Sequence, residues 1–156
     1  GNFSIGSGGT TTGLKVDSAG IVTMPLQSAF LMVDASDSQT FTNDADITFV
    51  TEVFDQNSDV ASSVFTAPVT GKYQFSMALR VSSGFTNSTN IYLFFTTSNR
   101  QHYYSMDGTY EASGLPLSVL TDMDAGDTAK VQTYGDGSAA VDGNAEQGWF
   151  SGHLVA

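Results

Sequence analysis

Apolar and polar residues alternate along one central segment of the chain. Every second residue from Tyr73 to Val81 is apolar, and the residues between them are polar except for Ala78. A period of two is typical of a β-strand that buries one face. The pattern therefore predicts a strand over residues 72–82.

Further short apolar runs follow one another through residues 26–156. Turn-forming Asp, Asn, Ser and Gly clusters separate them, and no useful length of chain shows the period of a helix. Many short, evenly spaced strands indicate an all-β antiparallel sandwich, jelly roll or barrel. The predicted strands cover residues 29–33, 46–50, 64–67, 72–82, 90–97, 102–106, 115–120, 129–134 and 149–155.

Residues 1–25 differ from the rest of the chain, because residues 2–12 are rich in Gly, Ser and Thr. After them, Leu14 and Ile21 lie on either side of a turn in which Gly20 supplies a positive φ. So small a hairpin cannot bury its apolar side alone and needs the main domain or other chains as a partner. We therefore divide the chain into a shaft-like or linker segment, 1–25, and a head domain, 26–156.

Two predicted strands carry large aromatic residues on both faces. In residues 90–97, Tyr92 and Phe94 lie opposite Ile91 and Phe95, and the last strand begins with Trp149. A sandwich strand normally exposes one polar face. Aromatic residues on both faces favour a subunit interface, although single exposed aromatic residues are also common.

The charge of the chain excludes some partners. Only 13% of the residues are charged, five Lys and Arg stand against 16 Asp and Glu, and the formal net charge is −11. A basic surface for nucleic acid or an anionic membrane is therefore not expected. No apolar run approaches the length of about 18 residues that a transmembrane helix needs. Cysteine is absent, so stability must come from the core or from oligomerisation.

No catalytic motif is visible. Ser151 and His153 lie on one face of the same predicted strand, which is poor geometry for a nucleophile and its base. The carboxylates fall mainly in predicted turns, and neither a phosphate-binding loop nor a zinc spacing is present. We predict a non-enzymatic protein without a cofactor. Calcium is the one alternative, at the carboxylates of Asp122, Asp124 and Asp127, although a tight turn is the interpretation that we favour.

Several pieces of sequence in a fixed order resemble a known family. They are Phe65-Thr-Ala-Pro-Val-Thr-Gly71, Tyr73-Gln-Phe75, Ala125-Gly-Asp127 and the C-terminal Phe150-Ser-Gly-His-Leu154. Together they resemble the tumour-necrosis-factor and complement one-q jelly roll over about residues 26–156. The resemblance implies ten strands and a compact trimer with aromatic residues at its three-fold axis. It implies four interface residues: Tyr92, Phe94, Tyr134 and Trp149.

A second resemblance concerns residues 13–24, which are similar to the shaft repeat of viral fibres and to the stretch before the tip of phage tail fibres. Together the two resemblances imply a trimeric fibre head on a virion surface, or otherwise an extracellular domain. It would attach to a host receptor, expected to be a saccharide. Exposed Tyr residues suit sugar rings, and the expected contact residues are Tyr103, Tyr104 and Tyr110. The alternatives are a structural trimerisation module, a secreted recognition domain and a monomeric carbohydrate-binding module.

Overall fold

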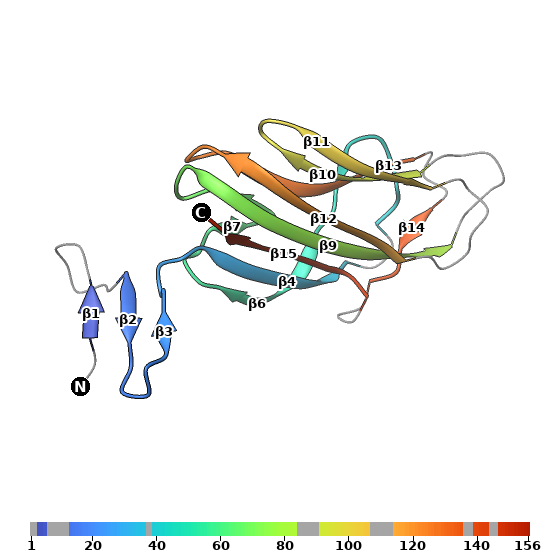
Figure 1. Cartoon of the computed structure of the whole chain (residues 1–156). Coiled ribbons are helices and arrows are strands. Elements are labelled where there is room, and N and C mark those ends of the chain that lie inside the picture. The colour runs from blue at the N-terminus through green and yellow to red at the C-terminus, as the bar shows by residue number, and fades with distance from the viewer. Residues whose placement is uncertain are drawn as a thin grey trace.

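The computed structural model describes residues 3–5, 13–36, 39–83, 91–106, 114–135, 139–143 and 147–156. Every regular element in this part of the chain is a β-strand, and the strands pair antiparallel. Two sheets stack face to face, and a small third sheet lies beside them at the N-terminal end (Figure 1). No helix in the described residues is long and apolar enough to cross a membrane.

The first of the stacked sheets, sheet I, is built around the strand with the regular alternation. Its order is β12-β9-β15-β4-β6, and β14 also pairs with β9. The strands are β4 (Ala29–Ala35), β6 (Phe49–Asp55), β9 (Gly71–Ser83), β12 (Gly114–Met123), β14 (Ala140–Val141) and β15 (Trp149–Leu154).

The second, sheet II, has the order β11-β10-β13-β8-β7, and β5 also pairs with β13. Its strands are β5 (Ala45–Asp46), β7 (Val60–Ala61), β8 (Val64–Thr66), β10 (Ile91–Thr97), β11 (Gln101–Met106) and β13 (Thr128–Tyr134). The expected antiparallel jelly-roll sandwich is therefore confirmed. It has more than ten strands because β5, β7 and β14 are two-residue strands.

The predicted strand over residues 46–50 is wrong. The chain instead changes sheets there: Asp46 ends β5 in sheet II, and Phe49 begins β6 in sheet I. The Ile47 N–H still donates to the carbonyl of Val131, whereas Phe49 pairs with Ala35. Both residues are buried, so the local pattern looks like one strand although two sheets share it.

Aromatic rings fill the space between the sheets. Phe75 on β9 lies at its centre, with ring centroids 4.8 Å from Phe95, 5.4 Å from Phe65 and 6.2 Å from Phe150. Such pairs contribute about 0.5–1.5 kcal/mol each beyond the area that they bury. The buried Tyr73 hydroxyl donates to the carbonyl of Val69 at 2.7 Å, and its burial raises the pKa of that hydroxyl.

The N-terminal sheet contains β1 (Phe3–Ile5), β2 (Leu14–Val16) and β3 (Val22–Thr23). The predicted turn between β2 and β3 is present: Gly20 has φ 82° and donates its N–H to the carbonyl of Asp17. Ile21 and Val22 remain 58% and 55% exposed. The hairpin therefore does not bury its apolar side against the head.

The segment after the hairpin is fastened to the head. The Gln56 and Asn57 side-chain amides donate to the carbonyls of Met24 and Leu26, each at 2.8 Å. The Gln27 amide donates to the carbonyl of Leu154 on the last strand. These bonds hold the start of the head domain against both the β6–β7 turn and the C-terminal strand.

Candidate functional site

Four aromatic side chains gather on the outer face of sheet II. Tyr92 and Phe94 lie on β10, Tyr103 on β11 and Tyr134 on β13. Cross-strand pairing explains the gathering, because Tyr92 is opposite Tyr134 and Phe94 is opposite Tyr103. Three of the four predicted interface residues thus lie with one of the predicted ligand-binding residues.

The four rings line a hollow of about 270 Å³, which we call the aromatic hollow. Tyr92 and Phe94 have nearly parallel rings, at 13°, with centroids 6.0 Å apart. Tyr103 and Tyr134 stand at 67° and 79° to Tyr92. The parallel pair and the two steeply inclined rings therefore form a concave surface.

A polar strip continues from the aromatic hollow along β13. Gln132, opposite Phe94, is 7% exposed, and its amide donates to the Asp46 carboxylate at 2.7 Å and the Asp44 carbonyl at 3.1 Å. Lys130 Nζ lies 2.8 Å from the same carboxylate. The sequence gives no sign of this strip, because Asp46 and Gln132 are far apart in the chain and meet only through the pairing of β5 with β13.

The other predicted ligand-binding residues do not join the hollow. Tyr104 pairs with the buried Leu93, so it faces the opposite side of β11 from Tyr103, where it is 45% exposed. Tyr110 lies outside the described residues. The fourth predicted interface residue, Trp149, lies on β15 in sheet I, on the other layer of the sandwich.

Trp149 belongs to a second notable surface, the outer face of sheet I. Pairing aligns one row of residues across all five strands of the sheet's main path, and its members on β15, β9 and β12 are serines. The row contains Phe54, Leu31, Ser151, Ser76 and Ser118. We call this surface the serine face. Ser76 Oγ and Ser118 Oγ are 2.8 Å apart, so the hydroxyls at its centre partly satisfy each other.

Two neighbouring rows extend the serine face. The pairings place Thr51, Val33, Trp149, Ala78 and Pro116 in one row and Ala29, His153, Gln74 and Leu120 in the other. None of the three rows contains Asp, Glu, Lys or Arg. Phe54 and Leu120 are 47% and 56% exposed. A chain of net charge −11 therefore carries a broad, uncharged and partly apolar sheet face.

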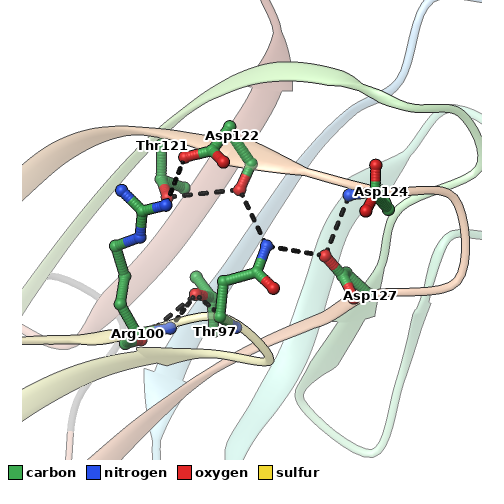
Figure 2. A network of polar contacts seen from close by, with 7 residues as sticks. Thr97, Arg100, Thr121, Asp122, Asp124 and Asp127 are labelled. Atoms are coloured by element: carbon green, nitrogen blue, oxygen red, sulfur yellow. Dashed lines mark hydrogen bonds and ion pairs between the residues drawn. The ribbon is translucent and has the colours of Figure 1, made fainter.

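The three weak calcium candidates belong to a hydrogen-bonded turn network (Figure 2). Asp122 forms an ion pair of 2.7 Å with Arg100, while the Asp127 carboxylate accepts the Asp124 N–H and the Asn99 amide at 2.8 and 2.9 Å. The Thr70 hydroxyl donates to Asp124, at 3.4 Å. No group of three or more His, Cys, Asp or Glu in the described residues is arranged to hold a metal. The geometry supports the tight-turn interpretation.

The histidines and serines form no catalytic arrangement in the described part of the chain. His102 pairs with the buried Phe95 on the inner side of β11, and His153 is exposed on the serine face. The Ser151 hydroxyl points to the carbonyl of Ser76 at 3.4 Å. Ser151 and His153 are neighbours on one face of β15, as the alternation predicts, without a third group to orient the imidazole.

The fold agrees with the comparisons to known proteins. The model of the C1q domain family matches residues 29–155, and the chain therefore belongs to that family. Domains of this kind are typically trimeric, secreted or extracellular, and generally non-enzymatic. No curated protein matches the chain significantly.

Solved structures with the same fold come from several animals. The globular domain of zebrafish complement 1qA is 18% identical, with a TM-score of 0.59 over 83% of this chain and 98% of that chain. Murine APRIL at pH 8.0 is 10% identical, with a TM-score of 0.60 over 83% and 99%. The Eiger TNF of S. frugiperda is 10% identical, with a TM-score of 0.59 over 83% and 93%. All three have the fold that the sequence resemblance implied.

Proposed function

We propose that the protein is a non-enzymatic homotrimeric head that attaches a fibre to a saccharide receptor on a host cell. The observation that carries the assembly is the serine face. The centre of a protein interface is depleted of charged residues, and this face has none in three rows across the main sheet. Five strands spaced about 4.8 Å apart make it about 19 Å wide.

In the proposed trimer the two outer faces of the sandwich have different roles. Three-fold assembly joins two different patches of neighbouring chains, so Trp149 on one layer and Tyr92 on the other are both compatible with an interface. We assign the serine face, which includes Trp149 on its middle strand and Phe54 on its edge strand, to subunit contact. The aromatic hollow, which the sequence analysis expected at the interface, is concave and is assigned to ligand instead.

The N-terminal hairpin supports placement at the end of a fibre. Ile21, Val22 and Met24 are exposed in one chain, and three copies around a common axis would cover their apolar side. A saccharide receptor suits such a head, because three weak sites that act together bind far more tightly than one. The head would then lie on a virion surface.

Two substitutions test the assembly. Ser76→Glu places a charge at the centre of the serine face, and Gln101→Glu places the same charge on an exposed edge strand of sheet II. We expect the purified protein and Gln101→Glu to have a mass near three times 16.4 kDa by light scattering. Ser76→Glu should fall to monomer, because burying an unpaired carboxylate is costly. A monomeric wild type, or a trimeric Ser76→Glu, would contradict the assignment.

Attachment is tested separately, with the intact trimer labelled and applied to glycan arrays and to bacterial and animal cells. Binding that is lost when the same saccharide is added free supports a receptor-binding head. Absence of any binding favours the structural trimerisation module.

The second candidate is a secreted recognition domain of cellular origin, which would also be trimeric. The membership of this chain in the C1q domain family favours it. Binding to animal cells or soluble animal proteins, and not to bacteria, would point to it.

A further inference from the structure

We propose that the aromatic hollow binds the apolar face of a neutral pyranose ring. This inference deepens the proposed attachment function and rests on it for the saccharide class. It concerns a site that the sequence alone had divided between subunit interface and ligand contact.

The shape of the hollow fits one sugar ring. The nearly parallel Tyr92 and Phe94 rings follow β10, while Tyr103 and Tyr134 project from the strands on either side. Strands spaced about 4.8 Å apart place β11 and β13 about 10 Å from each other. A volume of about 270 Å³ lies below the range of about 300–1,000 Å³ for drug-sized ligands. It therefore suits a small, flat ligand that stacks on an aromatic ring.

The polar groups at the hollow indicate a ligand with hydroxyl groups. No hydrogen bond within the described residues engages the hydroxyls of Tyr92, Tyr103 or Tyr134, and the last two side chains are 60% and 41% exposed. Each hydroxyl can donate one hydrogen bond and accept others. A purely apolar ligand would leave these groups without partners, whereas sugar hydroxyls would satisfy them while a ring face provides the stacking.

Gln132, which pairs with Phe94 on the neighbouring strand, places a fixed polar group beside the hollow without lining it. The Gln132 amide nitrogen is held by Asp46 and Asp44, and Lys130 neutralises the Asp46 carboxylate. Gln132 is therefore held in one orientation by groups of the protein itself. Polar residues held in place beside an aromatic surface are the arrangement that orients a small ligand.

Charge selects among saccharides. The chain has a net charge of −11, no Lys or Arg lines the hollow, and Lys130 on the same strand as Tyr134 is already paired with Asp46. An acidic sugar would meet a repulsive field and no free cation. The site is therefore assigned to neutral hexoses and N-acetylhexosamines, with sialic acid excluded by the same electrostatics.

The test uses ligand-observed NMR on the whole protein. Glucose, galactose, mannose and N-acetylglucosamine are compared with N-acetylneuraminic acid and with choline. Saturation transfer to at least one neutral sugar is expected, with none to N-acetylneuraminic acid. Transfer to choline alone would overturn the proposal and identify a cation-binding aromatic cage. Absence of transfer to every sugar would also overturn it.

Variants then locate the site. Tyr103→Ala removes one wall and should weaken the binding about tenfold, the effect of losing roughly 1.4 kcal/mol. Tyr103→Phe keeps the ring and should retain most of the binding. Tyr104→Ala is the matched control, since Tyr104 is the next residue, similarly exposed, on the opposite side of the strand. Equal losses in the Tyr103 and Tyr104 variants would contradict the site, and Tyr134→Ala repeats the test if Tyr103→Ala does not fold.

Light scattering on the same samples separates the two proposals. If the protein is a monomer and binds a neutral sugar through Tyr103, the saccharide proposal stands and the trimer proposal fails. Loss of the trimer in Tyr103→Ala, with Tyr104→Ala unchanged, would place the hollow at the subunit interface and overturn its assignment to a saccharide.

Discussion

At the scale of single residues, the tightest constraint is a glycine in the last strand. A Cβ atom at Gly152 would lie 2.5 Å from Cδ1 of Phe75 and 2.7 Å from Cε1 of Phe30. Two core rings from neighbouring strands therefore occupy the space that any other side chain would need. The glycine in the C-terminal Phe150-Ser-Gly-His-Leu154 stretch is thus explained by core packing.

Gly152→Ala should lower the free energy of unfolding by about 1–3 kcal/mol, the usual cost of overpacking a core. The matched control is Gly114→Ala at the start of β12, where a Cβ atom would meet no atom within 4 Å. Urea unfolding at equal protein concentration measures both. Equal midpoints for the two variants would show that the rings move aside without cost.

Residue-scale predictions from the sequence succeeded where they depended on neighbours in the chain. The alternation in β9 and the positive φ of Gly20 are both local properties, and both are confirmed. The separation of Tyr103 from Tyr104 is also inherent in strand geometry, since successive side chains point to opposite faces. Which of the two faces carries a site depends on the partner strands.

At the scale of elements, two turns of different strand pairs are joined by side chains. Asn99, in the β10–β11 turn, donates to Asp127 in the β12–β13 turn, and Arg100 pairs with Asp122 at the end of β12 (Figure 2). β10 belongs to sheet II and β12 to sheet I. The network therefore links the two layers at one end of the sandwich.

Asp127→Ala should destabilise the protein by about 1 kcal/mol, because the Asn99 amide and the Asp124 N–H both lose an acceptor at a partly exposed site. Asp127→Asn keeps an acceptor oxygen and should recover much of that loss. Thermal unfolding with and without calcium measures both effects. A rise in the melting temperature of the wild type with calcium, absent in Asp127→Ala, would restore the metal-site interpretation.

At the scale of the whole molecule, charge opposes the proposed assembly. Three copies of a chain of net charge −11 carry −33 in total. Contact through the uncharged serine face keeps these charges away from the interface, but their long-range repulsion remains. Assembly should therefore depend on ionic strength.

Raising NaCl from about 0.01 M to about 0.15 M shortens the screening length from about 30 Å to about 8 Å. We expect this change to shift the midpoint of trimer formation to lower protein concentration in light scattering. Gln101→Lys, which adds a positive charge away from the serine face, should reduce the dependence on salt. An assembly that weakens as salt increases would indicate that ion pairs hold it together.

The all-β class and most of the strands could be derived from the sequence. The change of sheets at residues 47–48 could not be derived from the sequence. Ile47 and Phe49 are both buried, and a local pattern of burial is the same for one core-facing strand as for two. Only the pairing with strands distant in the chain shows that β5 and β6 belong to different sheets. The hydrogen bond between Gln132 and Asp46 also depends on long-range pairing, so the sequence alone does not predict it.

The sequence by itself determined the all-β class, most of the strands, the buried face of the regularly alternating strand β9 and the absence of a recognisable catalytic motif. These follow from side-chain alternation and residue chemistry, which act between near neighbours. Only the tertiary structure decided that Tyr92, Phe94, Tyr103 and Tyr134 form one hollow while Trp149 lies on the other layer. The physical reason is register: hydrogen bonding between strands far apart in the chain sets which residues stand side by side, and a site is made of such neighbours.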